Sequence, residues 1–278
     1  MVDASLVTQT QEEISQAIDS HTKPVLWLSG GKESLTLLHL LRPWNTRITL
    51  LHNHLDGGWP GVTENLMALA DAWGFTTPML THPKLTFDEY VAQFGYQTDI
   101  VPTDSDTVIQ PPSPYQGEGM RVSSWWHCTL LRNIYPLLEA TMALGADAIL
   151  TGVRASDGAL FASMGAEASQ GKDVVGYVRY NPLYAWTAED IYAYLDGHHV
   201  PLPAHYQWKR AAGDAYEFPD CMRCTWQPEH WRILREHYPD VYAAHWPETK
   251  QVYEALAVKQ WDYTKRIMRV VMEGSDVL

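Results

Sequence analysis

The stretch Pro24-Val-Leu-Trp-Leu-Ser-Gly-Gly-Lys-Glu-Ser34 decides how the rest of the chain is interpreted. Residues 25–28 form an apolar run, which predicts a short strand buried on both faces, and Ser29-Gly30-Gly31 interrupts it. From Ser34 onward, leucines recur at helical spacing as far as Leu41. The sequence therefore predicts a strand, a glycine turn and a helix in immediate succession.

The glycine turn has the composition of a phosphate-binding loop. Glycine lets the backbone approach an anion closely, and the first N–H groups of the following helix, together with its dipole, favour negative charge. The spacing differs from the Walker loop, whose lysine follows a longer glycine spacer. The alternative is a structural glycine turn without a ligand. The predicted anion-binding residues are Ser29, Gly30, Gly31, Lys32, Glu33 and Ser34.

Composition limits the classes of function that need to be considered. The chain has 278 residues, 46% of them hydrophobic, which is enough for a large α/β domain with a helical annex. Its formal net charge of −13 argues against broad binding to nucleic acids, which depends on neutralising phosphates with lysine and arginine. We find no export signal and no apolar stretch of membrane-span length, so we expect a cytoplasmic protein. The oligomeric state is open, with a homodimer as one option.

Strands alternate with helices through most of the chain, which predicts an open, mostly parallel α/β sheet with helices on both faces. We expect the first helix at 11–20, an irregular proline-rich loop at 95–124, and a helix with Thr63 as its N-cap. No strand is expected after residue 200. The predicted domains are a nucleotide-binding α/β domain at 1–200 and a helical C-terminal region at 201–278. The expected strands are 25–28, 48–53, 78–82, 148–152 and 174–180.

Two further segments carry suitable chemistry at the carboxyl ends of predicted strands, where open α/β sheets bind ligands. Asp56 and Gly58 follow the second strand within an Asp-Gly-Gly turn. Gly152 and Arg154 end the fourth strand, and arginine is the residue best suited to bidentate contacts with phosphate. An ordinary turn and a surface ion pair are the respective alternatives.

Taken in order, these segments resemble the PP-loop ATP pyrophosphatases and phosphoadenosine phosphosulfate (PAPS) reductases. Ser29 to Ser34 is similar to their Ser-Gly-Gly-x-Asp-Ser loop, with Glu33 in place of the aspartate. The segment from Thr151 is similar to their Gly-Val-Arg-Ala-x-Glu-Ser-x-x-Arg motif, but Phe161 stands where a second arginine is expected. Asn181-Pro-Leu-Tyr-Ala-Trp-Thr-Ala-Glu-Asp-Ile191 resembles a further block, which we interpret as structural.

The resemblance implies an adenine nucleotide alpha hydrolase-like fold and an enzyme that binds ATP or a PAPS-like adenine nucleotide. In such enzymes ATP is cut between its α- and β-phosphates, and AMP is placed on an acceptor that the sequence does not identify. We assign phosphate binding to the loop, Mg²⁺ or ribose binding to Glu33 and Asp56, and the offset of developing charge to Arg154. The predicted catalytic residues are Lys32, Asp56 and Arg154, and Gly58 and Gly152 complete the predicted nucleotide site.

The three cysteines suggest metal or redox chemistry rather than disulfides. Cys221 and Cys224 form a C-x-x-C pair, and Cys128 stands at the start of a predicted helix, where a thiolate is favoured. The pattern resembles cluster-binding adenylylsulfate reductases, with His127 at the position of their first cysteine. It implies a [4Fe–4S] cluster or, through His127, a Cys₃His zinc site. Buried thiols without a metal are the third option.

Three functions follow from these patterns. The first is an adenylating ATP pyrophosphatase, with sulfur transfer through the cysteines as an extension. The second is a cluster-dependent sulfonucleotide reductase, although the chain has no cysteine after Cys224 to serve as the usual mobile nucleophile. The third is a nucleotide-binding subunit of a DNA-modification or defence complex that has lost catalysis.

Overall fold

The computed structural model describes residues 2–98, 122–157, 173–174, 177–211, 220–225, 230–254 and 257. The chain divides into two compact units, one made of residues 1–84 and 130–216 and the other of residues 85–129 and 217–278. The sequence predicted a single boundary after residue 200. The division seen here differs from it, because residues 85–129 group with the C-terminal part.

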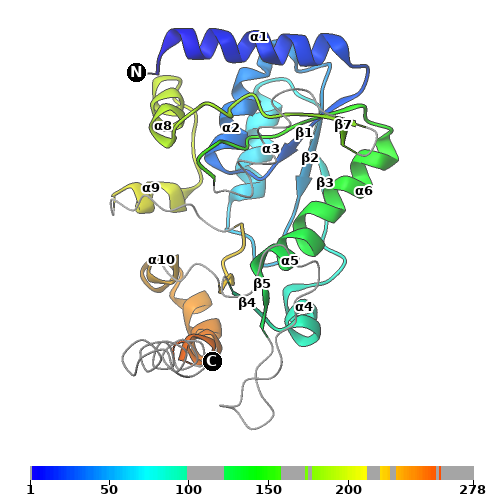
Figure 1. Cartoon of the computed structure of the whole chain (residues 1–278). Helices are drawn as coiled ribbons and strands as arrows, with labels where there is room; N and C mark the ends of the chain where they lie inside the picture. The colour runs from blue at the N-terminus through cyan, green and yellow to red at the C-terminus, as the bar shows by residue number, and fades with distance from the viewer. Residues whose placement is uncertain are drawn as a thin grey trace, which may run out of the picture. The chain divides into compact units, whose positions relative to one another are not determined.

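The first unit contains a six-stranded sheet with the strand order β3-β2-β1-β6-β8-β7 (Figure 1). Five strands are parallel, and β7 pairs antiparallel with β8. The prediction of an open, mostly parallel sheet is thus confirmed, but the single strand expected at 174–180 is wrong, since it is two strands. The strands are β1 Pro24–Leu28, β2 Thr49–Asn53, β3 Met79–Thr81, β6 Ala148–Leu150, β7 Asp173–Val174 and β8 Tyr177–Tyr180.

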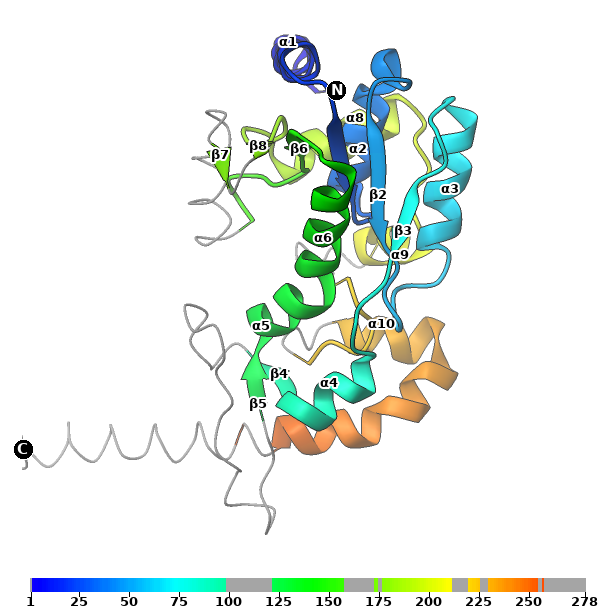
Figure 2. The same cartoon turned by 90° about the vertical axis from the view of Figure 1, so that its right-hand side faces the viewer.

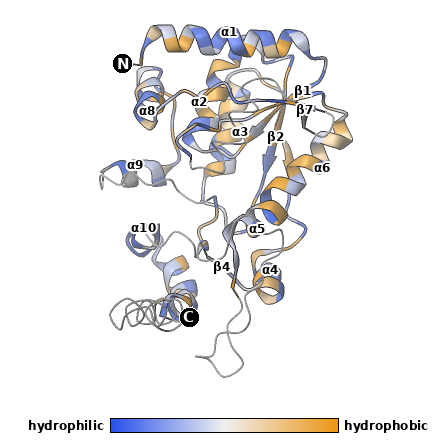
Figure 3. Cartoon of the chain, in the orientation of Figure 1, coloured by the Kyte–Doolittle hydropathy of each residue, from blue (hydrophilic) through white to orange (hydrophobic). Residues whose placement is uncertain are grey.

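Helices cover both faces of this sheet, as predicted (Figure 2). The leucines of α2 join a large apolar cluster with Ile14 of α1 and Ile191 of α8. On the opposite face, Leu137 of α6 packs with Trp27 and Ile149. Figure 3 shows hydrophobic residues along α2, α3 and α6 and a mixture of hydrophilic and hydrophobic residues along α1. The helices of this unit are α1 Ala4–Ser20, α2 Lys32–Leu40, α3 Val62–Ala72, α6 Tyr135–Leu144, α8 Ala188–Gly197 and α9 Ala204–Ala211.

Two predicted helix starts are wrong because other residues supply the caps. α1 begins at Ala4 rather than residue 11, since the Asp3 carboxylate accepts the Ser5 N–H at 2.8 Å. The N-cap of α3 is Gly61, at φ +78°, rather than Thr63. The Thr63 side chain instead serves two histidines, as described below.

The second unit holds α4 Phe87–Phe94, α5 Trp125–Thr129, α10 His230–His237 and a helical stretch at 239–254. A parallel pair of strands, β4 Tyr96–Thr98 and β5 Val122–Ser124, corrects the expectation of irregular structure throughout 95–124. The middle of that loop, 99–121, and nearly all of the predicted helical C-terminal region after residue 254 lie outside the described residues. Within the part of the chain that is described, no helix has the length and apolar character of a membrane span.

A partly buried histidine in the first unit makes stability depend on pH. Burial, with smaller contributions from His198 and Arg42, lowers the pKa of His39 to about 4. Since the unfolded imidazole titrates near pH 6.5, the unfolded state binds the proton more readily. The stabilisation from neutral His39 is therefore fully present above pH 6.5 and is lost as the pH falls towards 4.

We expect the midpoint temperature of thermal unfolding to decrease as the pH is lowered from 7 to 4.5. His39→Gln should make this dependence on pH less steep. The exposed His237→Gln serves as the control. Identical slopes in the wild type and in His39→Gln would contradict this assignment.

Candidate active site

The loop of residues 29–34 connects β1 to α2 and is held by its own serines. The Ser34 hydroxyl accepts the Gly30 N–H at 3.0 Å and donates to the Gly31 carbonyl at 2.9 Å. The Ser29 hydroxyl accepts the Gly31 N–H at 3.2 Å. Gly30 has φ +81°, and a Cβ there would lie 2.3 Å from Cγ1 of Val62. A glycine is thus required by both backbone conformation and space.

The charges at the loop form a compact, buried group. One oxygen of Glu33 lies 2.6 Å from the Lys32 ammonium and 3.0 Å from Nε of Arg154. Arg154 also reaches Asp157, at 2.8 Å through its guanidinium and at 2.7 Å through its backbone N–H. The Lys32 and Arg154 side chains are each only 3% exposed. Folding therefore brings Lys32, Glu33 and Arg154 together, as the sequence predicted that they share a site.

Gly152 explains how the end of β6 comes so close to the start of α2. A Cβ on Gly152 would lie 2.9 Å from Cβ of Glu33 and 3.2 Å from the backbone nitrogen of Ser34. Any larger residue would push these two segments apart. Gly152 thus acts through close approach of the backbone and brings Arg154 to the loop.

Two tyrosines that the sequence did not assign to the site enclose Lys32. The ammonium lies 5.9 Å from the ring centre of Tyr192 on α8 and 6.0 Å from that of Tyr206 on α9. The Tyr206 hydroxyl lies 2.9 Å from where a Cβ on Gly31 would be. No periodic pattern marks these residues, because they reach the loop only through the packing of α8 and α9.

Helix α9 is fastened on either side of Tyr206. The His205 ring stacks on Trp59, with ring centres 4.7 Å apart and 19° between the planes. Arg210 makes two hydrogen bonds to Asp196 of α8, at 2.9 and 2.7 Å. These contacts hold Tyr206 over the start of α2.

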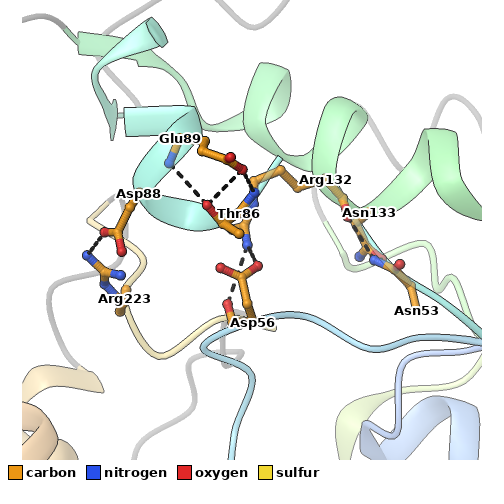
Figure 4. Close-up of polar contacts among 8 residues, drawn as sticks. All are labelled: Asn53, Asp56, Thr86, Asp88, Glu89, Arg132, Asn133 and Arg223. Atoms are coloured by element: carbon orange, nitrogen blue, oxygen red, sulfur yellow. Dashed lines mark hydrogen bonds and ion pairs between the residues drawn. The ribbon is translucent and has the colours of Figure 1, made fainter. Parts of the chain in front are cut away.

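Asp56 follows β2 and pairs with Arg132 (Figure 4). The Arg132 side chain is 3% exposed, and its guanidinium also donates to the Asp56 carbonyl at 3.3 Å. Arg132 belongs to a π-helical turn, Leu130–Ile134, that precedes α6. The Asn53 side chain donates to the Arg132 carbonyl at 2.8 Å and to Asn133 at 3.1 Å. Arg132 is therefore a functional candidate that the sequence analysis missed.

We expect Asp56→Asn to destabilise the protein by about 1–3 kcal/mol, because a buried guanidinium loses a charged acceptor. The matched control is Asp196→Asn, whose partner Arg210 is exposed, so that its cost stays within about 1 kcal/mol. Chemical denaturation compares the two. Equal losses would show that the Asp56–Arg132 pair contributes no more than a surface ion pair.

Asp56 and Glu33 were predicted as Mg²⁺ or ribose ligands. Both carboxylates are engaged by cations, Arg132 for the first and Lys32 and Arg154 for the second. Gly58 lies in the turn after β2, where its N–H donates to the Leu55 carbonyl at 3.0 Å. The Mg²⁺ role of these two carboxylates stays a prediction.

A family model for the phosphoadenosine phosphosulfate reductase domain matches residues 23–225. The chain belongs to this family. The PAPS reductase of Candida auris, solved as a phosphate complex, is similar in fold, with a TM-score of 0.50 and 18% identity over 76% of this chain and 88% of that one. The U34-tRNA thiolase NcsA of Methanococcus maripaludis, solved with a [4Fe–4S] cluster, has a TM-score of 0.44 and 14% identity over 90% of this chain and 79% of that one. No curated protein matches the chain.

Phe161, which stands where the PAPS reductase family motif has its second arginine, lies outside the described residues. Arg154, the first arginine of that motif, is described and buried beside Glu33.

The three cysteines fall in the second unit. Cys128 and Cys221 are partly exposed, and Cys224 is buried. The Cys224 N–H donates to the Cys221 carbonyl at 3.2 Å, so the C-x-x-C pair forms a turn. Among the described residues, no three histidine, cysteine or acidic side chains are grouped so as to hold a metal ion. The described arrangement of these side chains thus does not fit a three-cysteine cluster.

His127, the nitrogen ligand of the zinc alternative, is part of a buried hydrogen-bond network. Its Nδ1 lies 2.9 Å from the Tyr90 hydroxyl, which lies 3.0 Å from the Ser123 hydroxyl. Burial lowers the pKa of His127. These contacts give His127 a structural role within the second unit.

The last carbonyl of β1 is also held by a chain of side chains that the sequence analysis did not assign to the site. Nδ1 of His52 donates to the Leu28 carbonyl at 2.8 Å, which leaves Nε2 to accept the Thr63 hydroxyl at 2.9 Å. The Thr63 oxygen lies 2.9 Å from Nδ1 of His54. Burial is the main reason that the pKa of His52 is lowered, and the neutral ring fits this pattern of donors. The network ties the end of β1 to the start of α3.

Proposed function

We propose that this PAPS reductase-family protein is an ATP pyrophosphatase that transfers AMP to an acceptor. One observation carries the proposal. The loop of residues 29–34, with buried Lys32, follows the carboxyl end of β1, and buried Arg154 follows the carboxyl end of β6 and meets the loop at Glu33. Glycine positions in the loop, an ammonium and a guanidinium are the features that bind and neutralise phosphates.

In this proposal the chain works mainly by positioning and by neutralising charge. The acceptor oxygen attacks the α-phosphorus of ATP, the bond to the β-phosphate oxygen breaks, and pyrophosphate leaves with the electron pair. Lys32 and the loop backbone hold the phosphates, and Arg154 offsets the charge that develops. Glu33 neutralises both cations in the absence of the nucleotide, so a phosphate has to compete with it for them.

The test is to incubate the protein with ATP and Mg²⁺ and to measure pyrophosphate and AMP. Since the acceptor is unknown, hydroxylamine serves as a small nucleophile that captures an activated AMP group. Release of pyrophosphate together with an equal total of free AMP and its hydroxylamine adduct supports the proposal. ADP and phosphate as the products, or no turnover together with tight ATP binding, would contradict it. The latter result would favour the nucleotide-binding subunit without catalysis.

The extension to sulfur transfer and the sulfonucleotide reductase alternative both require the cysteines to bind a cluster. Cys128, Cys221 and Cys224 all lie in the second unit. Metal analysis tests whether they bind a cluster. Iron, sulfide and zinc are measured on anaerobically purified protein. Iron and sulfide in equal amounts would support a cluster, zinc alone would eliminate it, and the absence of all three would favour buried thiols.

A further inference from the structure

A single side chain, that of His52, holds the backbone where β1 passes into the loop of residues 29–34. His52 is the penultimate residue of β2, lies beside Leu28 in the parallel register and is 3% exposed. Its Nδ1 lies 2.8 Å from the Leu28 carbonyl oxygen. That carbonyl belongs to the same planar peptide unit as the N–H of Ser29, the first residue of the loop. The hydrogen bond therefore fixes the direction of the peptide with which the loop begins.

The hydrogen bonds around His52 run in one direction. A carbonyl oxygen can only accept, so Nδ1 must carry the proton, and in a neutral ring Nε2 then accepts. Burial, which is the main cause of the lowered pKa of His52, keeps the ring neutral near pH 7. The Thr63 hydroxyl, 2.9 Å from Nε2, donates its one proton there, and its oxygen accepts from Nδ1 of His54 at 2.9 Å. Thr63 thus selects the form of His52 that can hold the Leu28 carbonyl.

The same threonine also fixes a residue that packs on the loop. Thr63 follows Val62, the first residue of α3, and Cγ1 of Val62 lies so close to Gly30 that a Cβ on the glycine would be 2.3 Å away. The hydrogen bond between His52 and Thr63 therefore keeps the start of α3 against the loop. One histidine is thus linked to the first two residues of the loop, to Ser29 through a peptide and to Gly30 through α3.

We propose that His52 is a positioning residue of the nucleotide site, which acts through the Leu28–Ser29 peptide and through Thr63. This role rests on the function proposed above for the loop. Backbone N–H groups bind a phosphate well only when their directions are fixed in advance, and a displacement of about 1 Å can cost about 10²-fold in rate. His52 acts on the nucleotide only through the backbone that it holds.

The experiment compares two replacements of His52. The side-chain N–H of asparagine takes nearly the place of Nδ1, so His52→Asn can still donate to the Leu28 carbonyl, whereas His52→Leu cannot. We expect His52→Leu to weaken ATP binding roughly tenfold and to lower the rate of pyrophosphate release by about 10²-fold. His52→Asn should recover most of both losses. The control is His39→Leu, which removes a histidine bonded to Tyr194 near the other end of α2 and should keep the wild-type affinity and rate.

Nitrogen NMR tests the direction of the hydrogen bonds without any nucleotide. In protein that contains isotope-labelled histidine, the signals that disappear in His52→Asn belong to His52 and should show its proton on Nδ1 at neutral pH. A proton on Nε2 instead would overturn the proposal. Wild-type affinity and rate in His52→Leu, or equal losses in His52→Asn and His52→Leu, would also overturn it.

The measurements separate this proposal from the function on which it rests. If the wild type binds ATP but releases no pyrophosphate, the pyrophosphatase function is wrong, and the ATP affinities of the two His52 variants still decide the role of the histidine. If the wild type releases pyrophosphate and His52→Leu does so at the same rate, only the role of His52 is wrong. A wild type that does not bind ATP would overturn both.

Discussion

Lys32→Ala is expected to lower the rate of pyrophosphate release from ATP by about 10²–10³-fold, the usual effect of removing one electrostatic contact to a reacting group. The ammonium is buried beside Glu33 and between two tyrosine rings, so its charge acts in surroundings with little water. Glu33 keeps Arg154 as a partner when Lys32 is removed, and the variant should therefore still fold.

Lys84→Ala is the matched control, because Lys84 is an exposed lysine of the same unit that pairs with Glu139 at 2.5 Å. Its rate should equal that of the wild type. ATP affinity is measured in parallel by calorimetry. If Lys32→Ala bound and cleaved ATP as the wild type does, the loop of residues 29–34 would not be the phosphate site.

Gly30→Ala should abolish the same activity and also destabilise the first unit. At φ +81° a side chain is strained, which costs about 1–3 kcal/mol. The added methyl group would also lie 2.3 Å from Cγ1 of Val62, so that either the loop or the start of α3 must move. Thermal unfolding and the pyrophosphate assay follow the two consequences separately.

The chain offers a control that separates backbone strain from the collision. Gly61 has φ +78° but no atom within 4 Å of its would-be Cβ, so Gly61→Ala should carry the strain alone. The double variant Gly30→Ala/Val62→Ala should recover the part of the loss that the collision causes. Equal destabilisation by Gly30→Ala and Gly61→Ala would show that contact with Val62 has no role in holding the loop.

Local sequence patterns predicted much of the first unit. The apolar run before Ser29, the glycine turn and the leucines after Ser34 predicted β1, the loop and α2, and all three are present. The alternation of strands and helices likewise predicted the parallel sheet. Apolar residues recur at a different sequence period in strands and in helices, so both kinds of element can be recognised locally. The predictions failed where an element or a cap consists of only a few residues, because the sequence pattern is then too short to recognise. Examples are β4 and β5 and the cap of α1.

The sequence by itself determined that residues 29–34 have the composition of an anion-binding turn, because glycine, lysine and serine act within a few residues of one another. Only the tertiary structure decided which distant side chains reach that turn. Tyr206 lies over Gly31 because α9 is fastened to Trp59 and Asp196, and Arg132 reaches Asp56 through a π-helical turn. Such contacts join residues far apart in the chain, so no local periodicity records them. Burial then fixes which charges meet, as Lys32 and Arg154 do at Glu33.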